Sequence, residues 1–557
     1  MASSLSHKYY ILLNLCFLFG LCFIFKTHHL ITPNLPTLSS PSITDGCEAL
    51  DRFKDPETKC WYIKHNNPCV NQGYINYLHL FYCVCGGSPL LGYALLVSWL
   101  LVLFYLLGNT ASEYFCSSLE SLSRLLHLSP SLAGVTLLSL GNGAPDVFAS
   151  IVSFTGAGGS ANVGLGSVLG GALFVSTVVV GVISLYVGER RVPIDRSSFF
   201  RDACFLVAAA SLLLVVFVVG RINVFGAIAF VALYVVYVVV VSTTHLCNGS
   251  EKQSNSNSNP SPPECDELGA PLLGFVDEEK PKPKPTLIEN DDPQIEKSEL
   301  YDRLRQLVWV LGLPLYLPRR LTIPDASEEN WSKPYAVASA TFSPILLAFI
   351  WNSQIGESKK LAIYVCSALL GATLGSLALV TTERENPPRK CSLPWVAGGF
   401  MMSVTWAYIT AKELVGLLVS LARVLGIPSS VLALTVLAWG NSIGDLMTNV
   451  AMAVNGGPEG VQVAISGCYA GPVFNVLVGL GVSMMFAAGS ARPGPYLVKG
   501  DSSLYETVAF LVGGVLWVGV MLPRRGMRPD RVVGGGLLAL YLCFLCTRLA
   551  QTLGLVK

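Results

Sequence analysis

The chain of 557 residues is a succession of long apolar segments separated by shorter polar stretches. A helix that crosses a membrane needs roughly 20 mostly apolar residues, because the hydrocarbon core is about 30 Å thick and each helical residue rises about 1.5 Å. Backbone groups inside a bilayer must find their hydrogen-bond partners within the protein, so helices are expected and strands are not. Twelve segments are predicted to span: 88–107, 131–155, 161–187, 203–219, 224–246, 335–352, 361–381, 395–421, 430–454, 461–488, 505–522 and 531–551.

The charged content supports the same class of protein. Only 13% of the residues are charged, whereas an ordinary soluble domain has about 25%. The net charge of +1 gives no reason to expect nucleic acid or an acidic partner. The sequence therefore predicts an all-α polytopic membrane protein with about 12–13 spans. Its expected partners are the lipid bilayer and inorganic cations. The sequence does not indicate whether the protein is a monomer or an oligomer.

Polar stretches divide the chain into regions. Residues 1–26 include a further apolar segment after Lys8, which is typical of a signal peptide or a signal anchor. Residues 247–334 are rich in Ser, Asn, Pro, Glu and Lys, a composition that predicts a flexible acidic loop. The other predicted regions are a cysteine-containing segment at 27–87, a first half at 88–246, an extra helix pair at 335–381 and a second half at 382–557.

Basic residues predict the orientation of the spans. Arginines and lysines concentrate in three short loops, at 190–201, 384–390 and 524–531. With the spans above, these loops and the 247–334 loop lie on one side, which is expected to be cytosolic. The 27–87 segment then faces an oxidising compartment, where disulfides persist. It contains five cysteines, an odd number, so at least one of them has no partner within the segment.

Two regions about 300 residues apart repeat the same sequence pattern. An odd number of predicted spans separates them, so the two motif helices are expected to run in opposite directions. Inverted halves that meet at the midplane of the bilayer are an architecture of secondary transporters. The matched pieces are Thr110-Ala-Ser-Glu113 with Thr410-Ala-Lys-Glu413, Gly141-Asn-Gly-Ala-Pro-Asp146 with Gly440-Asn-Ser-Ile-Gly-Asp445, and Gly171-Ala-Leu-Phe174 with Gly471-Pro-Val-Phe474.

Asp146 and Asp445 are the acidic residues that fall near the middle of well-defined apolar segments. A carboxylate at the centre of a bilayer costs several kcal/mol unless it is compensated. Neither motif contains Lys or Arg, so a cation, a proton or water is expected to compensate the charge. The neighbouring Gly and Pro residues free backbone carbonyls, and Asn142, Asn441 and Ser442 add neutral oxygens. This is the oxygen ligand set of Ca²⁺ or Na⁺, and it is compatible with Mn²⁺.

Other polar residues of the apolar segments have simpler interpretations. Glu113 and Glu413 fall towards the ends of their spans and are expected to be solvated. Glu506 and Arg548 lie near span ends, where long side chains reach the interface. The cysteines of the spans are expected to be packing residues.

Three alternative interpretations of the motifs remain open. In the first interpretation, each aspartate only caps half of a broken helix, but the duplication of the motif disfavours this. The second interpretation is an intramembrane aspartyl protease, which also has two membrane aspartates, one of them in a Tyr-Asp pair. Here Asp146 follows Pro145, and the pair Tyr301-Asp302 lies outside every predicted span. A passive cation channel uses similar oxygen ligands, although an inverted repeat favours alternating access.

The two motifs resemble the alpha-repeat motifs of the sodium/calcium exchanger superfamily. More narrowly, they resemble the cation/calcium exchanger branch found in plants, which is similar to the mitochondrial sodium/calcium exchanger. The stretch Gly467-Cys-Tyr-Ala-Gly-Pro-Val-Phe-Asn475 also resembles that branch. The resemblance implies two inverted five-helix halves, to which the helix pair at 335–381 is an addition. It also implies a secondary active transporter without a cofactor, rather than an enzyme.

The transported ions follow from the same resemblance. It implies exchange of Ca²⁺, or of another cation, for Na⁺, K⁺ or H⁺, in a vacuolar membrane, another endomembrane or the plasma membrane. Asp146 and Asp445 become the central ion-binding carboxylates. Their implied neighbours in the site are Asn142, Asn441, Ser442 and Asn475.

The sequence also departs from the family pattern. Val175 stands opposite Asn475 in the repeat and cannot bind an ion, and Gly171 and Gly471 stand where many relatives have Ser. A K⁺ or Na⁺ antiporter coupled to H⁺ is therefore the alternative function.

Overall fold

The computed structural model describes residues 50, 53, 55–66, 73–118, 121, 139–155, 161–188, 190, 192–254, 316–327, 331–351, 357–384, 386–388, 392–498 and 500–554. Predictions about residues 1–26, and about most of the 247–334 loop, lie outside these ranges. The chain divides into two compact units, one of residues 53–277 and 396–557 and the other of residues 1–52 and 278–395. Each unit is described by itself.

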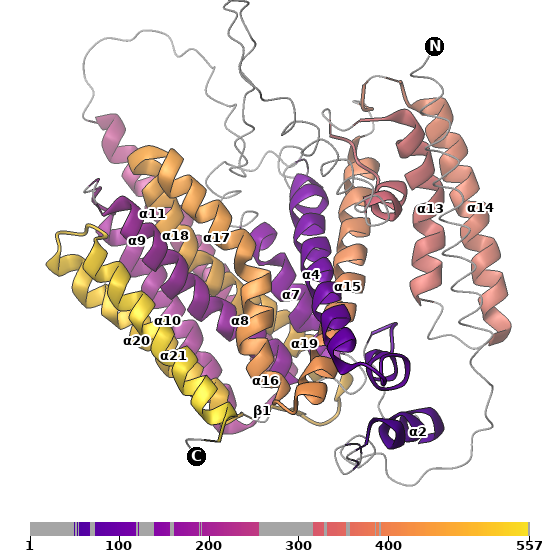
Figure 1. The fold of residues 1–557 in the computed structure, drawn as a ribbon. Helices are drawn as coiled ribbons and strands as arrows, with labels where there is room; N and C mark the ends of the chain where they lie inside the picture. The colour runs from indigo at the N-terminus through magenta and orange to yellow at the C-terminus, as the bar shows by residue number, and fades with distance from the viewer. Residues whose placement is uncertain are drawn as a thin grey trace, which may run out of the picture. The chain divides into compact units, whose positions relative to one another are not determined.

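Helices account for most of the larger unit (Figure 1). Its first part contains α2 (Pro56–Asn66), α3 (Tyr77–His79), η2 (Leu80–Val84), α4 (Pro89–Asn109), η3 (Thr110–Cys116), α7 (Ser139–Thr155), α8 (Ala161–Phe174), η5 (Val175–Val179), α9 (Val180–Val187), α10 (Arg196–Val219), β1 (Arg221–Ile222) and α11 (Val224–Ser254). Its second part contains α15 (Ser392–Leu425, in this unit from 396), α16 (Ser429–Leu432), η7 (Ala433–Leu437), α17 (Ala438–Asn455), α18 (Gly457–Phe474), η8 (Asn475–Leu480), α19 (Gly481–Ser490), β2 (Tyr496–Leu497), α20 (Ser502–Arg524) and α21 (Arg531–Thr552).

Ten helices of the described residues are long and apolar enough to cross a membrane. They correspond to ten of the twelve predicted spans, and they confirm an integral, multi-pass, all-α membrane protein. The predicted span 131–155 contains α7, and the predicted span 395–421 lies within α15; neither helix is among the ten. The ten are Pro89–Cys116, Ala161–Val187, Arg196–Val219, Val224–Thr244, Lys333–Ile350, Lys360–Thr381, Ser429–Asn455, Gly457–Ser490, Ser502–Arg524 and Arg531–Thr552.

Four helices, α7, α8, α17 and α18, pack against one another at the centre of the larger unit (Figure 1). Glycines of α8 allow this close approach, because a Cβ atom at Gly166 would lie 3.1 Å from the Cβ of Ala433 and one at Gly170 would meet the carbonyl of Leu434. A π-helical turn directly follows each of α8 and α18. These turns, η5 and η8, lie about 300 residues apart in the sequence. Such turns are frequent at functional sites.

The smaller unit contains the predicted extra helix pair. Its two long helices, α13 (Lys333–Trp351) and α14 (Glu357–Thr381), pack closely along each other. A Cβ atom at Gly371 would meet the backbone carbonyl of Thr341, and one at Gly375 would meet its side chain, so glycine allows the helices to approach.

A disulfide between Cys60 and Cys83 joins α2 to the segment that precedes α4. This disulfide lies within the predicted cysteine-containing segment at 27–87. Cys85 is free and buried, while Cys47 and Cys69 lie outside the described residues.

The prediction that Glu413 is solvated is wrong. Only 7% of this residue is exposed, because the segment before α4 folds back onto α15. The Glu413 carboxylate accepts hydrogen bonds from the Tyr74 backbone N–H and from the Tyr77 hydroxyl at 2.6 Å. The Tyr77 hydroxyl accepts a further hydrogen bond from Trp99 of α4 at 3.0 Å. Glu113, its counterpart in the repeat, is exposed as predicted.

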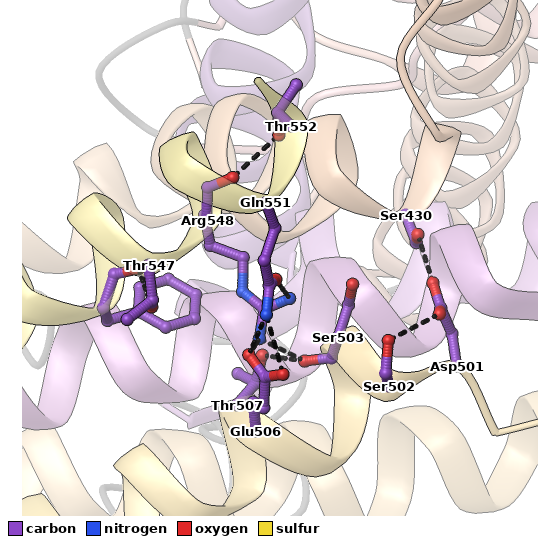
Figure 2. Close-up of polar contacts among 11 residues, drawn as sticks. Ser430, Asp501, Ser502, Ser503, Glu506, Thr507, Thr547, Arg548, Gln551 and Thr552 are labelled. Atoms are coloured by element: carbon purple, nitrogen blue, oxygen red, sulfur yellow. Dashed lines mark hydrogen bonds and ion pairs between the residues drawn. The ribbon is translucent and has the colours of Figure 1, made fainter. Parts of the chain in front are cut away.

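The interfacial interpretation of Arg548 is also wrong. Figure 2 shows its guanidinium turned towards the start of α20, where it lies 2.5 Å from the Glu506 carboxylate and donates to the Ser503 carbonyl at 3.1 Å. Gln551 donates to the same carboxylate at 2.8 Å, and Arg548 is only 2% exposed. The pair therefore ties the end of α21 to the start of α20.

A third buried aspartate, Asp202 of α10, escaped the sequence analysis because it precedes the apolar segment at 203–219. Its carboxylate pairs with Arg201 at 2.9 Å and accepts hydrogen bonds from Tyr237 of α11 at 3.0 Å and from Ser466 of α18 at 2.6 Å. Because Arg201 supplies the opposite charge, Asp202 joins three helices and has no need of a cation.

Candidate cation site

The two repeated motifs bring their aspartates into the centre of the four-helix packing. Asp146 on α7 is 3% exposed and Asp445 on α17 is 8% exposed. The α7 helix contains Pro145 directly before the carboxylate. Since α7 packs against α18 and α17 packs against α8, each motif helix contacts the other half of the repeat.

Three neutral groups donate hydrogen bonds to the Asp146 carboxylate. Its Oδ1 accepts from the Ser167 hydroxyl at 3.0 Å and from the Asn441 amide at 2.9 Å. Its Oδ2 accepts from the Asn475 amide at 3.0 Å. Ser167 belongs to α8, whereas Asn441 and Asn475 belong to the second half of the chain. The contacts of Asp146 therefore cross between the two halves.

Asp445 has a smaller set of partners. Asn142 of the first motif lies near its side chain, and Asn441 of the second motif donates to Asp146 of the first. The two carboxylates are close enough to repel each other electrostatically. Asn449, one turn after Asp445, donates to the Asp445 backbone carbonyl at 2.8 Å instead of to its carboxylate.

Three oxygens beside these carboxylates are buried and accept no hydrogen bond from the residues that the structure describes: Asn441 Oδ1, Ser442 Oγ and Asn475 Oδ1. Buried polar atoms nearly always have a partner, and a missing partner is expensive in a low-dielectric interior. Amide, hydroxyl and carboxylate oxygens are the ligands that Ca²⁺ and Na⁺ take. The donor set therefore fits a hard cation.

Glycine keeps space open next to this oxygen group. A Cβ atom at Gly171 would lie 3.1 Å from Asp146 Oδ2 and 3.1 Å from Ser442 Oγ, which places both oxygens around the same point. At Gly471, the matching position of the second half, no atom of the described part of the chain lies within 4 Å of an added Cβ. The two halves are therefore not equivalent at this position.

All six predicted site residues thus lie at the four-helix centre. Asp146 directly contacts Asn441 and Asn475, Ser442 faces it across Gly171, and Asn142 contacts Asp445. The sequence analysis missed Ser167. One serine in a Gly-rich apolar helix gives little signal, because such hydroxyls usually bond to the backbone of their own helix.

Apolar spanning helices that enclose carboxylates and neutral oxygens define an integral membrane protein with a buried polar centre. Comparison with known proteins narrows this class. The model of the family described as "Sodium/calcium exchanger protein" matches residues 96–243 and 395–550. The chain belongs to this family.

Relatives of known name agree with this assignment. The chain is 48% identical to cation/calcium exchanger 1 of Arabidopsis thaliana, over 93% of this chain and 90% of the relative. It is 31% identical to the mitochondrial sodium/calcium exchanger protein of Rattus norvegicus, over 89% of this chain and 88% of the relative. Among solved structures, it is 12% identical to the H⁺/Ca²⁺ exchanger CAX, with a TM-score of 0.42 over 91% of this chain and 89% of that one.

The family resemblance inferred from the two motifs is therefore confirmed. Because the family and its named members are exchangers, the chain is a membrane transporter and not an intramembrane protease.

Proposed function

We propose that this protein exchanges Ca²⁺ for Na⁺, K⁺ or H⁺ by alternating access, at a site built on Asp146 and Asp445. The names of its relatives, which are cation/calcium and sodium/calcium exchangers, support the choice of Ca²⁺. The oxygen donors around the carboxylates support a hard cation in general.

One observation carries the proposal: the contacts of Asp146 cross between the halves and leave three buried oxygens unpaired beside it. A structural role for Asp146 alone accounts for its hydrogen bonds. It does not account for acceptors that are removed from water and left without donors. A cation bound by Asn441 Oδ1, Ser442 Oγ and Asn475 Oδ1 supplies the missing partner.

The charge of the two carboxylates limits the stoichiometry. A site of charge −2 is neutralised by one divalent cation or by two monovalent ions, and leaving it partly neutralised is costly in the interior of a membrane protein. This favours exchange of one Ca²⁺ for two monovalent ions, close to electroneutral. Two inverted halves around one site expose it alternately to each side.

Flux measurements in vesicles containing the purified protein test the proposal. Ca²⁺ uptake is measured with Na⁺, K⁺ or a pH gradient on the opposite side, one counter-ion per experiment. Uptake by the wild type is expected to saturate and to require one of them. Asp146→Asn and Asp445→Asn each remove one charge of the site and are expected to reduce uptake at least tenfold, or about 1.4 kcal/mol.

The matched control is Asp530→Asn. Asp530 caps the start of α21 by accepting from the Val533 N–H, and asparagine is an equally good capping residue. This variant is expected to transport normally. Normal transport by either site variant contradicts the site, and conductance without a counter-ion contradicts exchange. Exchange of K⁺ or Na⁺ for H⁺ without Ca²⁺ transport establishes the alternative function instead.

A further inference from the structure

Ser167 contacts both Asp146 and an amide of the opposite half. It lies in α8 and is fully buried. Its hydroxyl donates to Asp146 Oδ1 at 3.0 Å and accepts from Asn441 Nδ2 at 3.1 Å. The same Asn441 nitrogen donates to Asp146 Oδ1 at 2.9 Å. Ser167, Asp146 and Asn441 therefore form a closed triangle of hydrogen bonds.

This triangle fixes which end of the Asn441 amide faces the unpaired oxygens. The amide nitrogen donates towards both Asp146 Oδ1 and Ser167 Oγ, and these two oxygens lie 3.0 Å apart on the same side of it. The nitrogen is held on this side, so Asn441 Oδ1 must point the other way, and it is one of the three buried unpaired oxygens. Without the Ser167 hydroxyl, the amide nitrogen keeps only Asp146 as an acceptor, and the amide is held less firmly in this orientation.

Two other buried serines of the same half, Ser184 and Ser153, bond to the backbone of their own helices. Ser184 lies on the same continuous helix and is equally buried, but its hydroxyl donates to the Val180 carbonyl one turn earlier. Ser153 of α7 donates to its own helix in the same way. Gly467 occupies the position of the second half that matches Ser167.

We propose that Ser167 is a positioning residue that sets the preference of the site for Ca²⁺ over Na⁺. The inference rests on the proposed function, since it assumes that Asn441 Oδ1 binds the transported cation. Ca²⁺ takes 6–8 oxygen ligands, so it depends strongly on having every available oxygen turned inward. An amide that presents its N–H₂ group instead removes one ligand and adds a positive dipole end. The resulting loss is larger for a divalent ion than for a monovalent one.

The test compares Ser167→Ala with Ser167→Thr and with the matched control Ser184→Ala. Two quantities are measured in vesicles: the Ca²⁺ concentration that gives half-maximal uptake, and the Na⁺ concentration on the same side that halves this uptake. Thermal unfolding in detergent verifies that each variant is folded. Ser167→Ala is expected to raise the half-maximal Ca²⁺ concentration about tenfold, or 1.4 kcal/mol, and to make Na⁺ the stronger competitor.

The conservative variant separates positioning from simple packing. Ser167→Thr keeps the hydroxyl and is expected to retain the wild-type preference, and Ser184→Ala is expected to do the same. A folded Ser167→Ala protein with unchanged half-maximal Ca²⁺ and unchanged Na⁺ competition overturns the inference. If Asp146→Asn is inactive in the same assay, the proposed function survives that result. Normal transport by Asp146→Asn overturns the proposed function itself.

Discussion

At the scale of single residues, the two halves of the repeat differ most clearly at Gly171 and Gly471. A methyl group at Gly171 would press against Asp146 Oδ2 and Ser442 Oγ, each at 3.1 Å, whereas one at Gly471 meets nothing within 4 Å. Overpacking of this kind typically costs about 1–3 kcal/mol, and at this position it takes space next to the unpaired oxygens.

The glycine pair therefore provides an internal control. Gly171→Ala is expected to lower Ca²⁺ uptake by about tenfold or more, because about 1.4 kcal/mol corresponds to a tenfold change in rate. Gly471→Ala is expected to transport like the wild type, because its methyl group enters open space. The measurement is uptake by equal amounts of folded protein in vesicles. If both variants lose uptake to a similar degree, the loss does not come from the filling of the space beside Asp146.

Whether a buried residue could be predicted from the sequence depends on the free energy that its burial costs. Asp146 and Asp445 were predictable because a carboxylate inside an apolar segment is expensive and therefore informative. Ser167 was not, because a serine costs little wherever it sits, and only its neighbours show that its hydroxyl leaves its own helix. Asp202 was missed because Arg201, beside it, makes the end of the helix look like a polar loop.

At the scale of elements, Glu413 joins α15 to the segment before α4. Its carboxylate accepts from the Tyr74 N–H and from the Tyr77 hydroxyl, and Tyr77 is held in turn by Trp99 of α4. Glu413→Gln replaces a charged acceptor by an amide whose N–H₂ group opposes one of these donors. Since hydrogen bonds to charged groups contribute about 1.5–3 kcal/mol, the variant is expected to unfold at a temperature several degrees lower.

The repeat again supplies the control. Glu113→Gln changes the same residue at the matching position, where the side chain is exposed, and is expected to leave the unfolding temperature unchanged. Thermal unfolding of both purified variants in one detergent is the measurement. Equal shifts would mean that the buried contacts of Glu413 contribute nothing to stability.

The same pair shows why element positions are easier to predict than element contacts. The apolar runs placed the helices, including α13 and α14, because the length needed to cross a bilayer is fixed. Glu113 and Glu413 have matching sequence contexts, however, and their environments differ only because the segment of Tyr74 and Tyr77 covers one of them. That segment is short, and nothing in its sequence marks it as a partner of α15.

At the scale of the whole molecule, the centre is assembled from parts that lie far apart in the sequence. Asp146 takes one hydrogen bond from its own half and two from the other, so neither half contains the complete group of oxygens. A cation that binds this group stabilises the packing of α7 and α8 against α17 and α18. Binding should therefore raise the stability of the entire larger unit and not only of a local segment.

This linkage gives a prediction that does not depend on transport. A ligand that binds only the folded protein stabilises it by RT ln(1 + [L]/Kd), about 2.7 kcal/mol at a hundredfold excess over Kd. Ca²⁺ is therefore expected to raise the unfolding temperature of the detergent-solubilised wild type with increasing concentration. Mg²⁺ is expected to act more weakly, because it demands a tighter octahedral geometry and gives up its water reluctantly.

The variants assign the effect to the centre. The doubly substituted protein, Asp146→Asn with Asp445→Asn, keeps the shape of both side chains and loses both charges, so Ca²⁺ should no longer stabilise it. Asp530→Asn should respond like the wild type, because Asp530 lies at the start of α21 and pairs with Arg525. If Ca²⁺ stabilises the double variant as strongly as the wild type, the ion binds elsewhere and the crossed contacts of Asp146 serve packing alone.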